Sequence, residues 1–123
     1  MSTPLLVVDD SKMSRRLIKR SIPPGWDVEV SEAQNGVEAL EAIRAGKAHV
    51  MFLDLTMPVM DGFQVLKEVR EENLDTMVIV ISADIQPKAE IRVKELGAMA
   101  FIKKPIDQEI LTKVLKEYGI YDG

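Results

Sequence analysis

Two adjacent carboxylates follow an apolar run near the start of the chain. In the stretch "LLVVDDS", the apolar residues Leu5 to Val8 lead directly into Asp9 and Asp10. Neighbouring carboxylates repel each other unless a positive charge lies close to them. The pair therefore either points into water or holds a cation.

Three further polar residues end apolar runs of the same kind. Asp54 ends "HVMFLD", Ser82 ends "MVIVIS", and Lys104 ends "MAFIKK". If the fold gathers these residues beside the acidic pair, the carboxylate oxygens of Asp9, Asp10 and Asp54 favour Mg²⁺ or a similar hard cation. The metal and the lysine would neutralise a transferring phosphoryl group, and the hydroxyl would donate a hydrogen bond to it. In that chemistry Asp54 is the nucleophile and becomes an aspartyl phosphate.

The elements that must position these residues follow from the hydrophobic pattern. Continuous apolar runs predict strands buried on both faces, whereas an alternating run predicts an edge strand. Strands are expected within 5–8, 26–33 (the alternating "WDVEVSEA"), 49–54, 77–82 and 99–104. Helices are expected between and after them, with these apolar stripes: Met13, Leu17 and Ile18; Val37, Leu40 and Ile43; Val65, Leu66 and Val69; Ala89, Val93 and Leu96; Ile110, Leu111, Val114 and Leu115.

Strands that alternate with helices predict a parallel sheet with right-handed crossovers and helices on both faces. The fold class is therefore α/β, with a doubly wound five-stranded sheet in the flavodoxin-like order 2-1-3-4-5. In that order the first and third strands are neighbours, and ligands bind beyond their carboxyl ends. Asp9, Asp10 and Asp54 should converge there. Taken singly, each of the three would be a helix cap, but capping explains the set of three poorly.

Length and composition narrow the function classes. The 123 residues fit one domain, and we expect a single domain over 1–123 with no output domain. The net charge of −4 argues against nucleic-acid binding, and the absence of cysteine excludes disulfides and thiolate metal sites. No apolar run approaches the length of a membrane span, and the first residues lack a basic leader. We therefore expect a cytoplasmic protein that binds neither membranes nor nucleic acids, and a monomer.

Four motifs together resemble one known family. The stretches "VVDDS", "FLDLTMPVMDG", "VISAD" and "FIKKP" occur in order, each at the end of an expected strand. The chain is similar to receiver domains of bacterial response regulators, of the single-domain, CheY-like chemotaxis type. The resemblance implies a phosphorylation switch of two-component signalling, with a histidine kinase as phosphodonor. It also implies a downstream protein target, and a phosphatase is a further expected partner.

The resemblance assigns a role to each matching residue. It implies that Asp9 and Asp10 hold Mg²⁺ together with Asp54 and the backbone carbonyl of Thr56. It implies that Asp54 is the phosphoacceptor and that Ser82 and Lys104 contact the phosphoryl group.

Other matching residues are implied to switch or tune the domain. Phe101 would change rotamer with Ser82 and so reshape an output face made by the fourth helix, fifth strand and fifth helix. Thr56 and Asp84 would tune dephosphorylation. Ile91 lies off its helix stripe, and we expect it to be exposed, either as a scattered surface residue or as part of the output face.

Two departures from the family pattern stand out. Ser82 replaces the commoner threonine and keeps the hydroxyl. Phe101 stands where chemotaxis regulators often have tyrosine, which puts binding to a flagellar motor in doubt.

Two other function classes share part of this pattern. A phosphorylation-independent, receiver-like interaction module would keep the fold without the intact polar set. A Mg²⁺-dependent phosphatase would need an acid where Thr56 stands, and a cap domain. We expect a self-phosphorylating and self-dephosphorylating switch, not an enzyme that turns over an external substrate.

Overall fold

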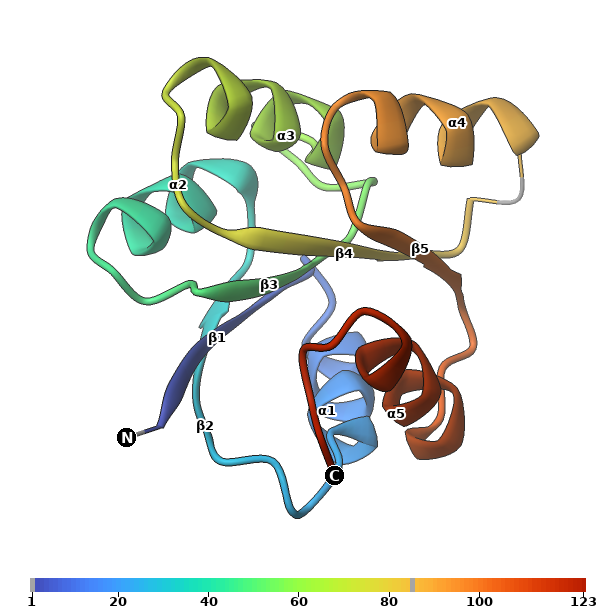
Figure 1. The fold of residues 1–123 in the computed structure, drawn as a ribbon. Helices are drawn as coiled ribbons and strands as arrows, with labels where there is room; N and C mark the ends of the chain where they lie inside the picture. The colour runs from blue at the N-terminus through green and yellow to red at the C-terminus, as the bar shows by residue number, and fades with distance from the viewer. Residues whose placement is uncertain (1, 85) are drawn as a thin grey trace.

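Five parallel strands form one sheet in the order β2-β1-β3-β4-β5 (Figure 1). The computed structural model describes residues 2–84 and 86–123. Strands and helices alternate along the chain, as the hydrophobic pattern predicts: β1 (Thr3–Val8), α1 (Lys12–Ser21), β2 (Val28–Ala33), α2 (Gly36–Arg44), β3 (Val50–Leu53), α3 (Gly62–Glu71), β4 (Met77–Ser82), α4 (Pro87–Glu95), β5 (Ala100–Lys103) and α5 (Gln108–Glu117).

Strands β1 and β3 are neighbours at the point where the strand order reverses. β1 pairs with β2 on one side and with β3 on the other, and Val8 is the partner of Leu53 in the second pairing. The residues that follow these two strands therefore emerge at the same end of the sheet, beyond the carboxyl ends of the strands. The alternating strand β2 lies at the outer edge, as predicted, and the doubly wound order is confirmed.

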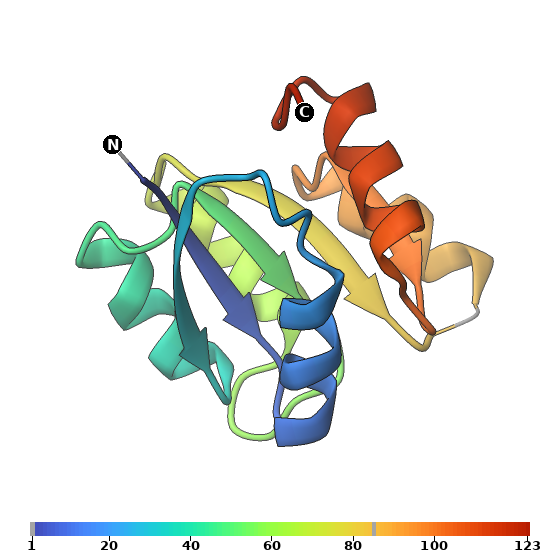
Figure 2. The ribbon, with the colours of Figure 1, turned by 90° about the horizontal axis from the view of Figure 1, so that it is seen from below.

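Helices cover both faces of the sheet. α2, α3 and α4 pack on one face, and α1 and α5 pack on the other (Figures 1 and 2). Successive strand residues point to opposite faces, so Leu6 and Val8 join the first core while Leu5 and Val7 join the second. These side chains are fully buried, as expected for a sheet that is covered on both sides.

The stripe predicted for α1 is confirmed for Ile18 and wrong for Met13 and Leu17. Met13 and Leu17 were expected in the buried stripe, but they are 70% and 50% exposed. The buried side chains of α1 are instead Arg15, Ile18 and Ser21. The reason is chemical: the guanidinium of Arg15 finds hydrogen-bond acceptors inside the protein, so the helix can turn this face inward.

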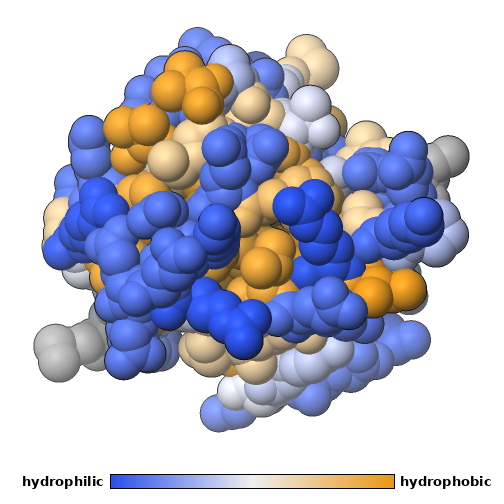
Figure 3. All heavy atoms as spheres, turned by 90° about the horizontal axis from the view of Figure 1, so that it is seen from above, coloured by the Kyte–Doolittle hydropathy of each residue, from blue (hydrophilic) through white to orange (hydrophobic). Residues whose placement is uncertain are grey.

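Two other stripes begin with an exposed residue. Val37 in α2 and Ile110 in α5 are 40% and 41% exposed. Both lie in the first turn of their helix. Figure 3 shows the face formed by α2, α3 and α4, where hydrophilic side chains predominate and apolar ones show between them.

Side-chain caps fix where four of the helices begin. Ser11, Asn35, Asp61 and Asp107 each accept a hydrogen bond from a backbone N–H in the first turn of the following helix. Neither Asp9, Asp10 nor Asp54 has this role. Capping therefore does not explain the three carboxylates. No helix within 2–84 and 86–123 is long and apolar enough to cross a membrane.

Candidate functional site

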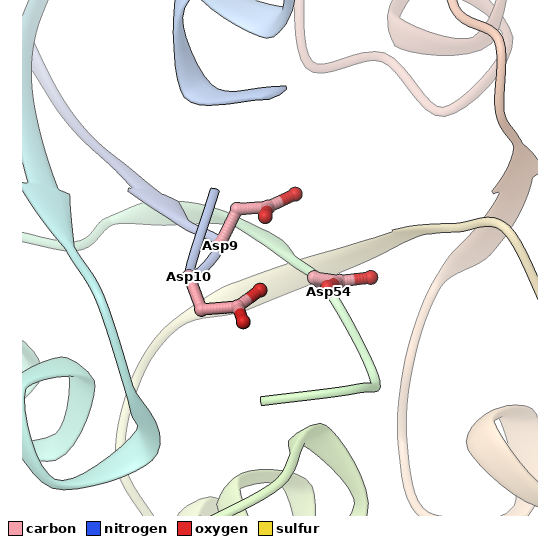
Figure 4. A group of neighbouring side chains, drawn as sticks. All are labelled: Asp9, Asp10 and Asp54. Atoms are coloured by element: carbon pink, nitrogen blue, oxygen red, sulfur yellow. The ribbon is translucent and has the colours of Figure 1, made fainter. Parts of the chain in front are cut away.

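Three carboxylates converge beyond the carboxyl ends of β1 and β3. Asp9 and Asp10 follow β1, Asp54 follows β3, and the three side chains point the same way (Figure 4). One oxygen atom from each lies within 4.8 Å of the other two. Backbone hydrogen bonds extend the sheet to this point, since the N–H of Asp54 donates to Val8 (2.9 Å) and that of Asp9 to Ala33 (3.1 Å).

The carboxylate of Asp9 is buried and held on several sides. Its Oδ1 accepts a hydrogen bond from the backbone N–H of Ser11 (2.9 Å). Its Oδ2 accepts from the hydroxyl of Ser14 (2.6 Å) and from the ammonium of Lys104 (2.7 Å). These hydrogen bonds compensate for the burial of the Asp9 side chain, since only 1% of the residue is exposed.

Asp54 is in a less favourable position for a charge. It is 6% exposed, and the Nζ of Lys104 lies 3.7 Å from its Oδ1. Burial, together with the smaller effects of the charges of Asp9 and Asp10, raises the pKa of Asp54 to about 6, although Lys104 and the N–H of Leu55 oppose the shift. A buried carboxylate with a raised pKa beside a lysine is typical of a functional site.

The donor set fits a hard divalent cation. Three carboxylates offer oxygen ligands within one small region, and Asp10 among them is exposed to solvent. When all groups are ionised, three carboxylates and the ammonium of Lys104 leave two net negative charges, which a divalent cation would balance. Oxygen ligands without nitrogen or sulfur favour Mg²⁺ over zinc.

The loop between β3 and α3 is packed tightly against Asp54. The N–H of Gly62 donates to the carbonyl of Leu55 (3.0 Å), and a Cβ at position 62 would lie 2.4 Å from the carbonyl oxygen of Asp54. Only glycine fits there, which accounts for the "DG" of the motif. Asp61 caps α3 in a capping box with Gln64.

One residue of this loop is in an unfavourable conformation. Val59 has a φ of 68° and is 81% exposed. A β-branched side chain rarely adopts this left-handed region. Val59 lies in the same loop as Thr56, and this loop comes directly after Asp54. Strained conformations of this kind tend to cluster at functional sites.

Ser82 and Lys104 end neighbouring strands near the carboxylates. The backbone N–H of Lys104 donates to the carbonyl of Ser82 (2.9 Å). Ser82 is 1% exposed, and its hydroxyl oxygen accepts a hydrogen bond from the N–H of Asp84 (3.2 Å). The carboxylate of Asp84 in turn accepts from the N–H of Gln86 (2.9 Å). Of the two, Lys104 contacts the carboxylates, and Ser82 is directed to its own turn.

Three other candidate residues, Thr56, Phe101 and Ile91, do not bond to the carboxylates. Thr56 is exposed in the β3–α3 loop. Phe101 is partly buried and packs on the core shared by α3 and α4. Ile91 is 59% exposed on α4, so its predicted exposure is confirmed. Among the described residues, none of these three forms a hydrogen bond or ion pair with the carboxylates.

Two residues of the site were missed in the sequence. Ser14 bonds the carboxylate of Asp9, and Arg15 donates from Nη1 to the backbone carbonyl of Asp9 (2.7 Å). Both lie on α1, and their spacing from Ile18 places Arg15 on the buried face. The signal in the sequence was this spacing, but an apolar pattern assigns no burial to an arginine.

Comparison with known proteins gives a family. The model of the response regulator receiver domain matches residues 5–116. A protein-glutamate methylesterase/protein-glutamine glutaminase of Geobacter sulfurreducens is 41% identical over 112 residues. That match covers 88% of this chain and 30% of the relative, so the chain spans less than a third of that protein. The chemotaxis protein CheY of Bacillus subtilis is 32% identical over 118 residues, which cover 95% of this chain and 98% of CheY.

Solved structures agree with this result. The chain resembles one in the crystal structure of the CheX-CheY-BeF3-Mg+2 complex from Borrelia burgdorferi, with a TM-score of 0.82 and 28% identity. The match covers 94% of this chain and 89% of that one.

Proposed function

The chain belongs to the response regulator receiver domain family of two-component signalling, and from this premise we propose that Asp54 accepts the phosphoryl group. The observation that supports the assignment is the convergence of Asp9, Asp10 and Asp54 with Lys104 at the switch point of the sheet. Of the three carboxylates, Asp9 already accepts three hydrogen bonds and Asp10 is exposed. Asp54 is left as the buried carboxylate that can act as nucleophile.

Asp9, Asp10, Asp54 and the backbone carbonyl of Thr56 would hold Mg²⁺. When bound, the metal would withdraw charge from the phosphoryl oxygens and balance the carboxylates. The Borrelia burgdorferi complex that this chain resembles is described with Mg and BeF3, which supports the assignment.

The reaction forms one bond and breaks another. An oxygen of Asp54 forms a P–O bond to the phosphoryl group as the P–N bond of a phosphohistidine breaks and the imidazole leaves. Lys104 already lies 3.7 Å from Asp54. Its ammonium can follow the charge that the phosphoryl group brings, which would loosen its contact with Asp9.

The signal would leave the domain through protein contact. The hydroxyl of Ser82 accepts a hydrogen bond from the N–H of Asp84 and can still donate its own proton to the phosphoryl group. Ser82 ends β4, ahead of α4, and Phe101 on β5 packs on the core under α3 and α4. We expect the output face to comprise α4, β5 and α5, with Ile91 exposed on it and a histidine kinase and a target protein as partners. Chemotaxis is the pathway that the CheY relatives favour.

Intact mass after incubation with Mg²⁺ and acetyl phosphate tests the proposal. We expect one added phosphoryl group in the wild type, and none without Mg²⁺ or in Asp54→Asn. Asp61→Asn is the matched control, since it alters a carboxylate of the same loop and asparagine caps a helix as well as aspartate. If neither an adduct nor shifted amide resonances with Mg²⁺ are found, the chain is instead a phosphorylation-independent interaction module.

A further inference from the structure

Arg15 is the only buried cationic side chain among the residues that the structure describes. It is 8% exposed and lies on α1, beneath the loop that carries the acidic pair. Arginine is rarely buried unless its donors are satisfied and its charge is paired. Its location therefore has to be explained by its partners.

The first partner is the peptide that joins Asp9 to Asp10. Nη1 of Arg15 donates to the carbonyl oxygen of Asp9 at 2.7 Å, in a buried hydrogen bond. That carbonyl and the N–H of Asp10 belong to one planar peptide unit. Arg15 thus fixes the plane from which the Asp10 side chain starts. Asp10 is exposed, so its direction depends on this backbone more than on packing.

The second partner fixes Arg15 itself. Its Nε donates to Glu32 on the edge strand β2 at 2.9 Å, and Lys19 holds the other oxygen of Glu32 at 3.0 Å. The hydrogen bond from Lys19 and the one from Arg15 lower the pKa of Glu32, although partial burial acts to raise it. The guanidinium is held between a carboxylate on β2 and a carbonyl at the end of β1.

We propose that Arg15 is a positioning residue of the cation site, which acts on Asp10 through the Asp9–Asp10 peptide and is oriented by Glu32. The inference rests on the proposed Mg²⁺ site. Mutation of a partner that orients a metal ligand from behind typically costs about 10- to 100-fold in metal affinity. Glu32 does not contact the three carboxylates, but it would contribute to cation binding through Arg15.

The charge of Arg15 and its positioning role predict opposite effects. Removal of a positive charge near the carboxylates should tighten cation binding by simple Coulomb attraction. Loss of the buried hydrogen bond should instead free the Asp9–Asp10 peptide and weaken binding. Arg16 is the next residue and is exposed, so Arg16→Met removes the same charge without that hydrogen bond and is the matched control.

The test is a titration with Mg²⁺, followed by the amide resonances of the β1–α1 loop, with no phosphodonor present. We expect the Kd for Mg²⁺ to rise about tenfold in Arg15→Met and to stay equal or fall slightly in Arg16→Met. Arg15→Lys keeps the charge but cannot bridge both partners, so its Kd should also rise. Equal or tighter binding in Arg15→Met, with Arg16→Met unchanged, would overturn the inference.

A second variant keeps the test valid if Arg15→Met does not fold. Glu32→Gln leaves Arg15 in place and removes the charge that orients it; we expect the Kd to rise about threefold. The exposed residue Glu29 on the same strand provides the control Glu29→Gln. If the wild type binds no Mg²⁺, the proposed cation site is wrong and the inference fails with it. If the wild type binds Mg²⁺ and Glu32→Gln binds as well as Glu29→Gln, only the inference fails.

Discussion

Asp54→Asn should make the metal-free protein more stable. Burial raises the pKa of Asp54 to about 6 from an ordinary value of 3.8, so the folded state disfavours the ionised carboxylate. One pKa unit corresponds to about 1.4 kcal/mol, and the shift therefore destabilises the folded protein by about 3 kcal/mol above pH 7. Asparagine has the same shape without the charge. Lys104 keeps its stronger contact with Asp9, at 2.7 Å.

The direction with pH follows from the sign of the shift. A carboxyl group whose pKa is raised on folding favours the folded state fully below the unfolded value and loses that contribution as pH rises through the folded value. The advantage of Asp54→Asn should therefore grow between about pH 4 and pH 6. It should reach about 3 kcal/mol at pH 8 and be about half as large at pH 5.

Urea unfolding in EDTA, at about pH 5 and about pH 8, measures this difference. Asp75 is exposed, and Asp75→Asn should change the free energy of unfolding by less than about 0.5 kcal/mol at either pH. The reasoning is refuted if Asp54→Asn is no more stable than the wild type at pH 8. It is refuted equally if the gain does not depend on pH.

Three further changes test the loops around the site. Val59→Asn should raise the free energy of unfolding by about 1 kcal/mol in urea, because asparagine tolerates the left-handed φ of 68°; a lower value contradicts the assignment of strain. Gly62→Ala should lower it by about 2 to 3 kcal/mol, since the new Cβ would meet the backbone of Asp54. Gly46→Ala, where a Cβ meets nothing within 4 Å, should lose only about 1 kcal/mol from its positive φ; equal losses at both glycines contradict the contact. Asp84→Asn should change the lifetime of the phosphorylated protein, followed as loss of the mass adduct; an identical lifetime excludes a tuning role for Asp84.

The fold was predictable because its signals are local and consistent. Each buried strand is a continuous apolar run, and each run is followed by a turn and an amphipathic helix, which leaves few topologies. The strand ends differ from the expected ones by one or two residues. β1 begins at Thr3 rather than Leu5, because Thr3 and Pro4 pair with β2, and the apolar pattern does not record pairing.

The polar residues that end apolar runs were predictable from the sequence, whereas the residues that support them from neighbouring elements were not. Asp9, Asp10, Asp54 and Lys104 end apolar runs, so the strand order alone brings them together. Arg15 interrupts an apolar pattern and was overlooked. Its burial depends on a carbonyl beyond β1 and on Glu32 on β2, and the sequence shows neither contact.

The single tryptophan comes before a strand, at its amino end, whereas the carboxylates follow the carboxyl ends of their strands. Trp26 precedes β2 and packs on Phe52 and Tyr121, with ring centroids 6.4 and 6.1 Å apart. Phe52 is fully buried on β3 and lies two residues before Asp54 in the chain, so one aromatic ring connects the indole with the strand that leads to the site. The emission of Trp26 is therefore a spectroscopic reporter of global unfolding and of any movement of Phe52. An unchanged emission on phosphorylation would show that this ring contact stays in place.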